Sequence, residues 1–255
     1  GLPTAAILAH KGFNVLGIDN NEEIIQTIKQ KKIHIVEPGL EKIVSSVIES
    51  ENFKVSVLPT TSDIFIIAVP TPIRDDNIPD TSFVMAAIES ISEFLQPGNL
   101  VILESTSPVG TSEKCVDLLR ELRADLVFPE FNNNRDDEDV FFAHSPERVL
   151  PGKILEEIIE NDRVIGGISD ESTKVAVKFY ESFVNGKCLQ TDSRTAELCK
   201  LVENSYRDLN IAFANELSMI SHEFDVDVWK LIELANRHPR VDILQPGPGV
   251  GGHCI

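Results

Sequence analysis

The stretch DIFIIAVPTP, residues 63–72, decides the fold class of this 255-residue chain. Its apolar run, residues 64–69, is far too short to cross a bilayer and suits a strand that is buried on both faces. A second apolar run, LVILEST at residues 100–106, follows a helical pattern over residues 82–95. Buried strands that alternate with helices are typical of a parallel sheet covered by helices on both faces. We therefore expect a doubly wound α/β fold.

The second half of the chain has a different pattern, that of one long helix over residues 195–224. Its apolar residues recur at helical spacing and form one stripe, which we expect to pack against the core. A second, shorter helix follows, and then a polar loop. The sequence therefore predicts two parts, an α/β domain at residues 1–190 and a helical region at residues 191–255.

The totals exclude several classes of protein. The net charge is −18 and the Lys and Arg residues form no dense block, which disfavours a nucleic-acid partner, because phosphate binding needs a basic surface. The four cysteines include no pair at Cys-x-x-Cys spacing, so we expect neither a disulfide framework nor a metal site. No leader or membrane-spanning run is visible, and we expect a cytoplasmic protein without a membrane partner.

Polar residues mark the places where the predicted strands end, which is where ligands bind in parallel α/β sheets. Asp19 ends one strand pattern, Thr71 and Thr106 follow two buried strands, and Glu147 follows another apolar segment. In dinucleotide-binding folds, an acid about 20 residues past the glycine fingerprint binds the ribose hydroxyls. Asp19 has this role if Gly1 is the last glycine of such a fingerprint. The alternative is an ordinary surface acid at a strand end.

The long predicted helix and the loop beyond it carry a second group of candidate residues. Lys200, Asn204 and Arg207 share one helix face, and an ammonium, an amide and a guanidinium together bind oxyanions. His238 and Arg240 lie in the loop after the next helix and suit an anionic ligand. In both places the alternative is charge that only faces solvent.

The stretch GPGVGGHCI, residues 247–255, places a thiol behind a glycine turn. Glycines let the backbone approach a ligand closely and leave its N–H groups free. A thiolate is a strong nucleophile, and nearby positive charge lowers the pKa of a cysteine. The stretch therefore indicates Cys254 as a nucleophile, with a buried cysteine after a flexible turn as the alternative.

Eight motifs, in order along the whole chain, resemble those of one family. They are LGIDN (16–20), HIVEPGL (34–40), IAVPTP (67–72), ILESTSPVGT (102–111), SPERVLPG (145–152), NDRVIGG (161–167), SRTAELCKLVENSYRDLNIAFANELS (193–218) and NRHPRVDILQPGPGVGGHCI (236–255). The chain is similar to the UDP-sugar 6-dehydrogenases of the UDP-glucose/GDP-mannose dehydrogenase family. The resemblance implies a Rossmann-like NAD-binding domain, a homodimer formed through the long helix, and a four-electron oxidation of a UDP-sugar that consumes two NAD.

The resemblance also implies a substrate and a set of roles. Residues 242–255 resemble the members that oxidise UDP-N-acetyl-D-mannosamine to UDP-N-acetyl-D-mannosaminuronate. Cys254 would capture the intermediate aldehyde as a thiohemiacetal that is oxidised to a thioester, Lys200 and Asn204 would stabilise oxyanions, and Glu147 with Thr106 would assist hydrolysis. The implied NAD contacts are Gly1, Asp19, Thr71 and Thr106, and the implied substrate contacts are Arg148, Val149, Lys200, Asn204, Arg207, His238, Arg240 and Gly251.

The chain also departs from the family pattern. The family begins with a strand and a GxGxxG turn, of which Gly1 alone is present, and it continues past the cysteine into a domain that binds UDP. We therefore expect a fragment, truncated at both ends, that does not turn over alone. Three other functions stay open: another UDP-sugar 6-dehydrogenase such as that for UDP-glucose, a two-electron hydroxyacid dehydrogenase that does not need Cys254, and a non-catalytic nucleotide-sugar sensor.

Overall fold

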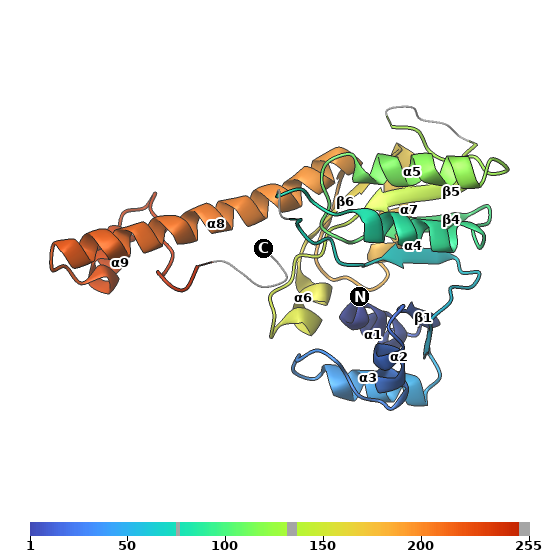
Figure 1. Cartoon of the computed structure of the whole chain (residues 1–255), viewed down its shortest axis with the longest axis horizontal. Helices are drawn as coiled ribbons and strands as arrows, with labels where there is room; N and C mark the ends of the chain where they lie inside the picture. The colour runs from blue at the N-terminus through green and yellow to red at the C-terminus, as the bar shows by residue number, and fades with distance from the viewer. Residues whose placement is uncertain (75–76, 132–136, 250–255) are drawn as a thin grey trace. The chain divides into compact units, whose positions relative to one another are not determined.

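The computed structural model describes residues 1–74, 77–131 and 137–249 (Figure 1). By its internal contacts the chain divides into two compact units, Gly1–Leu198 and Cys199–Ile255. The functional division at residue 190 that the sequence suggests stays a prediction.

The first unit contains two sheets. In the smaller sheet, β1 (Val15–Ile18) pairs in parallel with β2 (Phe53–Ser56). In the larger sheet the strands follow one another in chain order, as β3 (Ile64–Ile67), β4 (Asn99–Leu103), β5 (Val140–His144), β6 (Arg163–Gly167) and β7 (Cys188–Asp192).

All strand pairs are parallel except β5 with β6, whose short antiparallel register joins Ala143 to Gly167 and His144 to Gly166. The predicted α/β fold with a parallel sheet is confirmed, with this one reversal and a division into two sheets as the differences.

Helices cover both faces of the larger sheet, as expected for strands that are apolar on both sides. Residues Val101 and Leu103 of β4 face α4 (Ser82–Ser92) and α5 (Thr111–Leu122), which lie side by side. Alternate residues Leu100 and Ile102 face the other core cluster, to which α1 (Leu2–His10), α6 (Ile154–Glu160) and α7 (Asp170–Tyr180) contribute.

The smaller sheet has a core of its own. Leu40 and Val44 of α3 (Leu40–Glu49) pack with Phe53 of β2 against the small side chains Ala6 and Ala9 of α1. Helix α2 (Glu22–Lys29) adds Ile28, and the Asn21 side chain caps its first turn by accepting the Glu23 N–H. Helix α1 therefore belongs to the cores of both sheets.

The long predicted helix is confirmed as α8 (Ser193–Glu223), and α9 (Val228–Ala235) follows it, with Asp227 as its N-cap. The expectation that the apolar stripe of α8 packs in the core is wrong for this chain. Leu209 is 69 % exposed, Val202 is 55 % exposed and Phe213 is 53 % exposed. Helical spacing shows that an apolar face exists, but it does not say what covers it. Among the described residues, no helix is long and apolar enough to span a membrane.

Candidate functional site

Two candidate residues meet beyond the carboxyl ends of neighbouring strands β3 and β4. Thr71 lies in the loop after β3, and its hydroxyl donates to the backbone carbonyl of Thr106, at 2.7 Å. The same two loops are joined again where the Ser105 hydroxyl donates to the carbonyl of Val69, also at 2.7 Å. Hydrogen bonds between the loops hold Thr71 and Thr106 at one edge of the sheet, where parallel sheets bind their ligands.

Glu147, after β5, belongs to a polar cluster at the same edge. The guanidinium of Arg163 lies 3.4 Å from one Glu147 oxygen and 3.6 Å from a Glu104 oxygen. The Thr4 hydroxyl of α1 is 3.5 Å from an oxygen of each of these carboxyl groups. The Tyr180 hydroxyl donates to Glu104 at 2.9 Å, and its ring lies under the Arg163 guanidinium.

The two carboxyl groups of this cluster differ in exposure. Glu104 is 3 % exposed, whereas the Glu147 side chain is 30 % exposed. Burial raises the pKa of Glu104, and the neighbouring Glu147 raises it further, while Arg163 opposes the shift. One guanidinium therefore faces two carboxyl groups, and burial disfavours the charged form of the inner one, Glu104.

Sequence reasoning missed four members of this cluster, Thr4, Glu104, Arg163 and Tyr180. The position of Glu104 could have indicated its role, because it directly follows β4, whose five residues are all buried. A charged side chain at such a place needs a partner. Its partner Tyr180 lies 76 residues further along the chain, and no spacing rule connects them.

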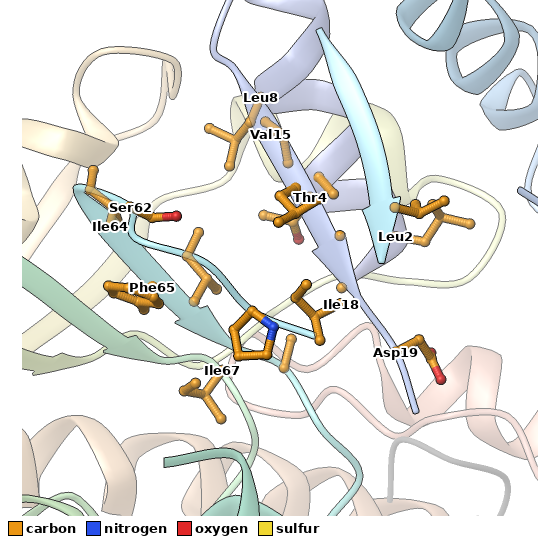
Figure 2. A pocket seen from close by; sticks show the side chains of 18 of the residues that line it. Leu2, Thr4, Leu8, Val15, Ile18, Asp19, Ser62, Ile64, Phe65 and Ile67 are labelled. Carbon is orange, nitrogen blue, oxygen red and sulfur yellow. The ribbon is translucent and has the colours of Figure 1, made fainter. Parts of the chain in front are cut away.

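A cavity of about 650 Å³ lies between β1 and β3 (Figure 2). Its lining is mostly apolar and comes from β1, β2, β3, α1, α2 and α4. Figure 2 labels Leu2, Thr4, Leu8, Val15, Ile18, Asp19, Ser62, Ile64, Phe65 and Ile67. Gly1 and Asp19, two of the four residues expected to contact NAD, line the same cavity. The structure thus brings these two together.

Both strands that flank this cavity have a free edge. Within the described residues β1 pairs with β2 alone and β3 pairs with β4 alone, so each presents an unpaired row of backbone N–H and C=O groups. Helix α1 begins at Leu2, with Gly1 as its N-cap and without a side-chain cap on its first turn. The start of α1 and the end of β1 lie at one end of this cavity, where Gly1 and Asp19 line it.

The remaining candidate residues occupy helix α8 and two loops. Lys200 and Asn204 are half-buried on α8, and Arg207 is exposed one turn further on, all on one face. Arg148 and Val149 are half-buried in the loop after β5, where the Arg148 guanidinium donates to the Asp162 carbonyl at 3.1 Å.

His238 and Arg240 are exposed, and the Arg240 N–H donates to the His238 ring at 3.4 Å. Gly251 and Cys254 lie outside the residues that the structure describes. Among the residues that it does describe, no group of three His, Cys, Asp or Glu side chains is arranged to hold a metal ion.

Comparison with known proteins gives matches over nearly the whole chain. Residues 1–184 match the NAD-binding domain of the UDP-glucose/GDP-mannose dehydrogenase family, and residues 194–255 match its central domain. The chain is 53 % identical to UDP-N-acetyl-D-mannosamine dehydrogenase of Campylobacter jejuni, covering all of this chain and 62 % of that protein.

It is also 52 % identical to NDP-N-acetyl-D-galactosaminuronic acid dehydrogenase of a Ralstonia nicotianae strain, of which it covers 60 %. The solved structure of a UDP-D-ManNAc dehydrogenase from Pyrococcus horikoshii is 43 % identical, with a TM-score of 0.92 over this whole chain and 59 % of that one. The chain thus spans about 60 % of the length of the curated relatives that it matches.

Proposed function

The chain belongs to the UDP-glucose/GDP-mannose dehydrogenase family, and from this we propose that it is the larger part of an NAD-dependent UDP-sugar 6-dehydrogenase. One observation carries the proposal: Thr106 and Glu147 stand at the carboxyl edge of the sheet, in a chain whose two parts match the two family domains. In the proposed division, residues 1–190 bind NAD and residues 191–255 carry the helix face and the cysteine loop.

The residues at the carboxyl edge fit a dinucleotide. The uncapped first N–H groups of α1 suit a diphosphate, and the half-buried Asp19 carboxylate at the end of β1 suits two ribose hydroxyls. Thr71 and Thr106, joined by a hydrogen bond at the ends of β3 and β4, would contact the same cofactor. We propose that a strand preceding Gly1 in the full-length protein fills the cavity between β1 and β3, and that its glycine turn completes the diphosphate site.

The proposed reaction oxidises the C6 alcohol of the sugar in two steps, and bound NAD supplies the hydride acceptor for each. Lys200 accepts the alcohol proton and, with Asn204, stabilises oxyanions at C6. The thiolate of Cys254 adds to the aldehyde, and loss of a second hydride from the thiohemiacetal leaves a thioester. Glu147 then removes a proton from water as the water oxygen attacks the thioester, and the products are the carboxylate and the free thiol.

The cationic residues suit a UDP-sugar, because guanidinium groups bind the two phosphates well. We assign Arg148, Val149, Arg207, His238, Arg240 and Gly251 to this substrate. The exposed apolar face of α8 supports a homodimer through that helix, since a stripe with Leu209 and Phe213 on the surface is the kind of patch that a second copy covers.

The choice of sugar rests on the relatives, which are named for N-acetylmannosamine and for N-acetylgalactosaminuronic acid. We propose UDP-N-acetyl-D-mannosamine as the substrate, with UDP-glucose as the nearest alternative. The test incubates the full-length protein with NAD and each UDP-sugar in turn and follows NADH absorbance. We expect kcat/KM for UDP-N-acetyl-D-mannosamine to exceed that for UDP-glucose by at least about 100-fold, because a site built to bind an acetamido group leaves polar groups unpaired without it.

Equal rates with the two sugars would show that this chain does not select the acetamido group. Binding of the sugar without any NADH would instead favour the nucleotide-sugar sensor.

A further inference from the structure

The loop between α2 and α3 exposes an apolar side chain and buries a charged one next to it. Val36 is 100 % exposed, whereas Glu37 is 6 % exposed. Exposing a valine while removing a carboxylate from water is unfavourable unless the carboxylate gains strong partners. The partners of Glu37 therefore explain the conformation of this loop.

Both oxygens of Glu37 accept hydrogen bonds from one distant backbone segment. The Gly152 N–H donates to one oxygen at 2.8 Å, and the Ile154 N–H donates to the other at 2.9 Å. These N–H groups stand at the start of α6, where the helix dipole also favours a negative charge. Charge-assisted hydrogen bonds of this kind are among the stronger ones in proteins.

The segment that Glu37 holds is the continuation of the loop with Arg148 and Val149. Two other hydrogen bonds of this segment come from close by in the chain: the Leu150 N–H donates to Glu157, and the Asn161 side chain donates to the Arg148 carbonyl. Glu37 reaches the same loop from 115 residues away and from the half of the unit that carries α1, α3 and β1. It ties the loop to the part of the fold that would bind the dinucleotide.

We propose that Glu37 is a positioning residue for the UDP-sugar, which fixes the backbone of residues 148–154 so that Arg148 and Val149 meet the substrate. The inference rests on the proposed function, because it takes the substrate role of that loop from it. Glu37 itself touches no reacting atom. It restricts the backbone conformations of the loop before the substrate binds. Ordering the loop on binding would otherwise weaken the affinity for the UDP-sugar.

The test compares Glu37→Ala with Glu37→Gln in the full-length protein, by measuring kcat and the two KM values. We expect Glu37→Ala to raise KM for the UDP-sugar about tenfold or more, the loss that corresponds to one buried hydrogen bond with a charged group. We expect kcat and KM for NAD to change less than about twofold. Glu37→Gln keeps one acceptor oxygen and should recover part of the loss.

A matched control is Asp139→Asn, since the Asp139 carboxylate accepts the Val127 N–H, away from α6. It should leave KM for the UDP-sugar unchanged. A merely structural role of Glu37 would change kcat and both KM values together, or would change none of them, and either result overturns the inference. If Glu37→Ala does not fold, as judged by circular dichroism, the Gln variant decides the question by the same KM comparison.

Arg148→Ala separates the inference from the proposed function. If it raises KM for the UDP-sugar and the Glu37 variants do not, the positioning role is wrong while the substrate role of the loop stands. If Arg148→Ala also leaves KM unchanged, the loop does not bind the substrate and both are wrong.

Discussion

The two halves of the first unit meet in two very different ways. At the cavity between β1 and β3 they face each other with apolar side chains and unpaired strand edges. At the carboxyl edge they are joined by polar contacts: Thr4 of α1 reaches Glu104 and Glu147, and Glu37 holds the loop before α6. Hydrogen bonds therefore hold the two halves together at the carboxyl edge, whereas no strand pairing among the described residues joins them at the cavity.

The strands themselves show the same contrast. All five residues of β4 are buried, and this strand is paired along both edges. The equally apolar β3 has one free edge, and alternate residues of it are half-buried. Composition is similar in the two strands, so pairing decides which of them becomes fully buried. The unpaired edges of β1 and β3 support the proposal that a further strand fills the cavity.

The largest expected effect comes from filling the open region. We compare this chain with the same chain extended at its N-terminus by the strand and glycine turn of the full-length protein, and measure NAD affinity by calorimetry. Two restored backbone N–H contacts to the diphosphate, at about 1.5 kcal/mol each, should tighten NAD binding roughly a hundredfold.

The control for this comparison is an extension of equal length and scrambled sequence, which cannot pair in register with β1 and β3. Equal NAD affinity in all three proteins would mean that the cavity is not a strand site, and the contrast between the two regions would lose its explanation.

A smaller effect should appear in the closed region, at the buried His144 that ends β5. Burial lowers the pKa of His144 to about 3, although the Leu103 carbonyl opposes the shift. A histidine with a lowered folded-state pKa contributes stability above its ordinary pKa of about 6.5, and this stability is lost as the pH falls toward 3. The free energy of unfolding should fall by about 1.4 kcal/mol for each pH unit below the ordinary pKa of about 6.5.

The measurement for His144 is the free energy of unfolding by urea between pH 7 and pH 4.5, for the native chain and His144→Leu. The variant should lose less stability over this range. The matched control is His10→Gln, since His10 is exposed on α1. Parallel pH profiles of the native chain and His144→Leu would contradict the closed packing at the end of β5.

Local patterns predicted much of the fold and part of the site. Strand ends pointed to Asp19, Thr71, Thr106 and Glu147, because the chemistry of parallel sheets lies at their carboxyl edge. Glu104 and Glu37 received no role from the sequence, since their partners are tens of residues to more than a hundred residues away. Pairing at that range depends on how the halves pack, and sequence spacing does not carry it.

The prediction that the apolar stripe of α8 packs in the core was wrong for a related reason. Helical spacing predicts which residues share a face of α8. It does not predict whether that face is buried, because burial depends on what packs against the helix. The sequence therefore predicted the residues of this face of α8, but it did not predict that the face is exposed.

We propose that the full-length protein carries out a four-electron oxidation, to which this chain contributes Lys200 and Cys254. The most direct test of this proposal counts NADH formed per UDP-N-acetyl-D-mannosamine consumed, in the full-length protein and in Cys254→Ser. We predict two NADH per sugar for the native protein. The Cys254→Ser variant should form fewer than two NADH per sugar, because it lacks the thiolate that captures the aldehyde for the second oxidation. One NADH per sugar, or a variant indistinguishable from the native protein, would show that Cys254 is no nucleophile and would contradict the account.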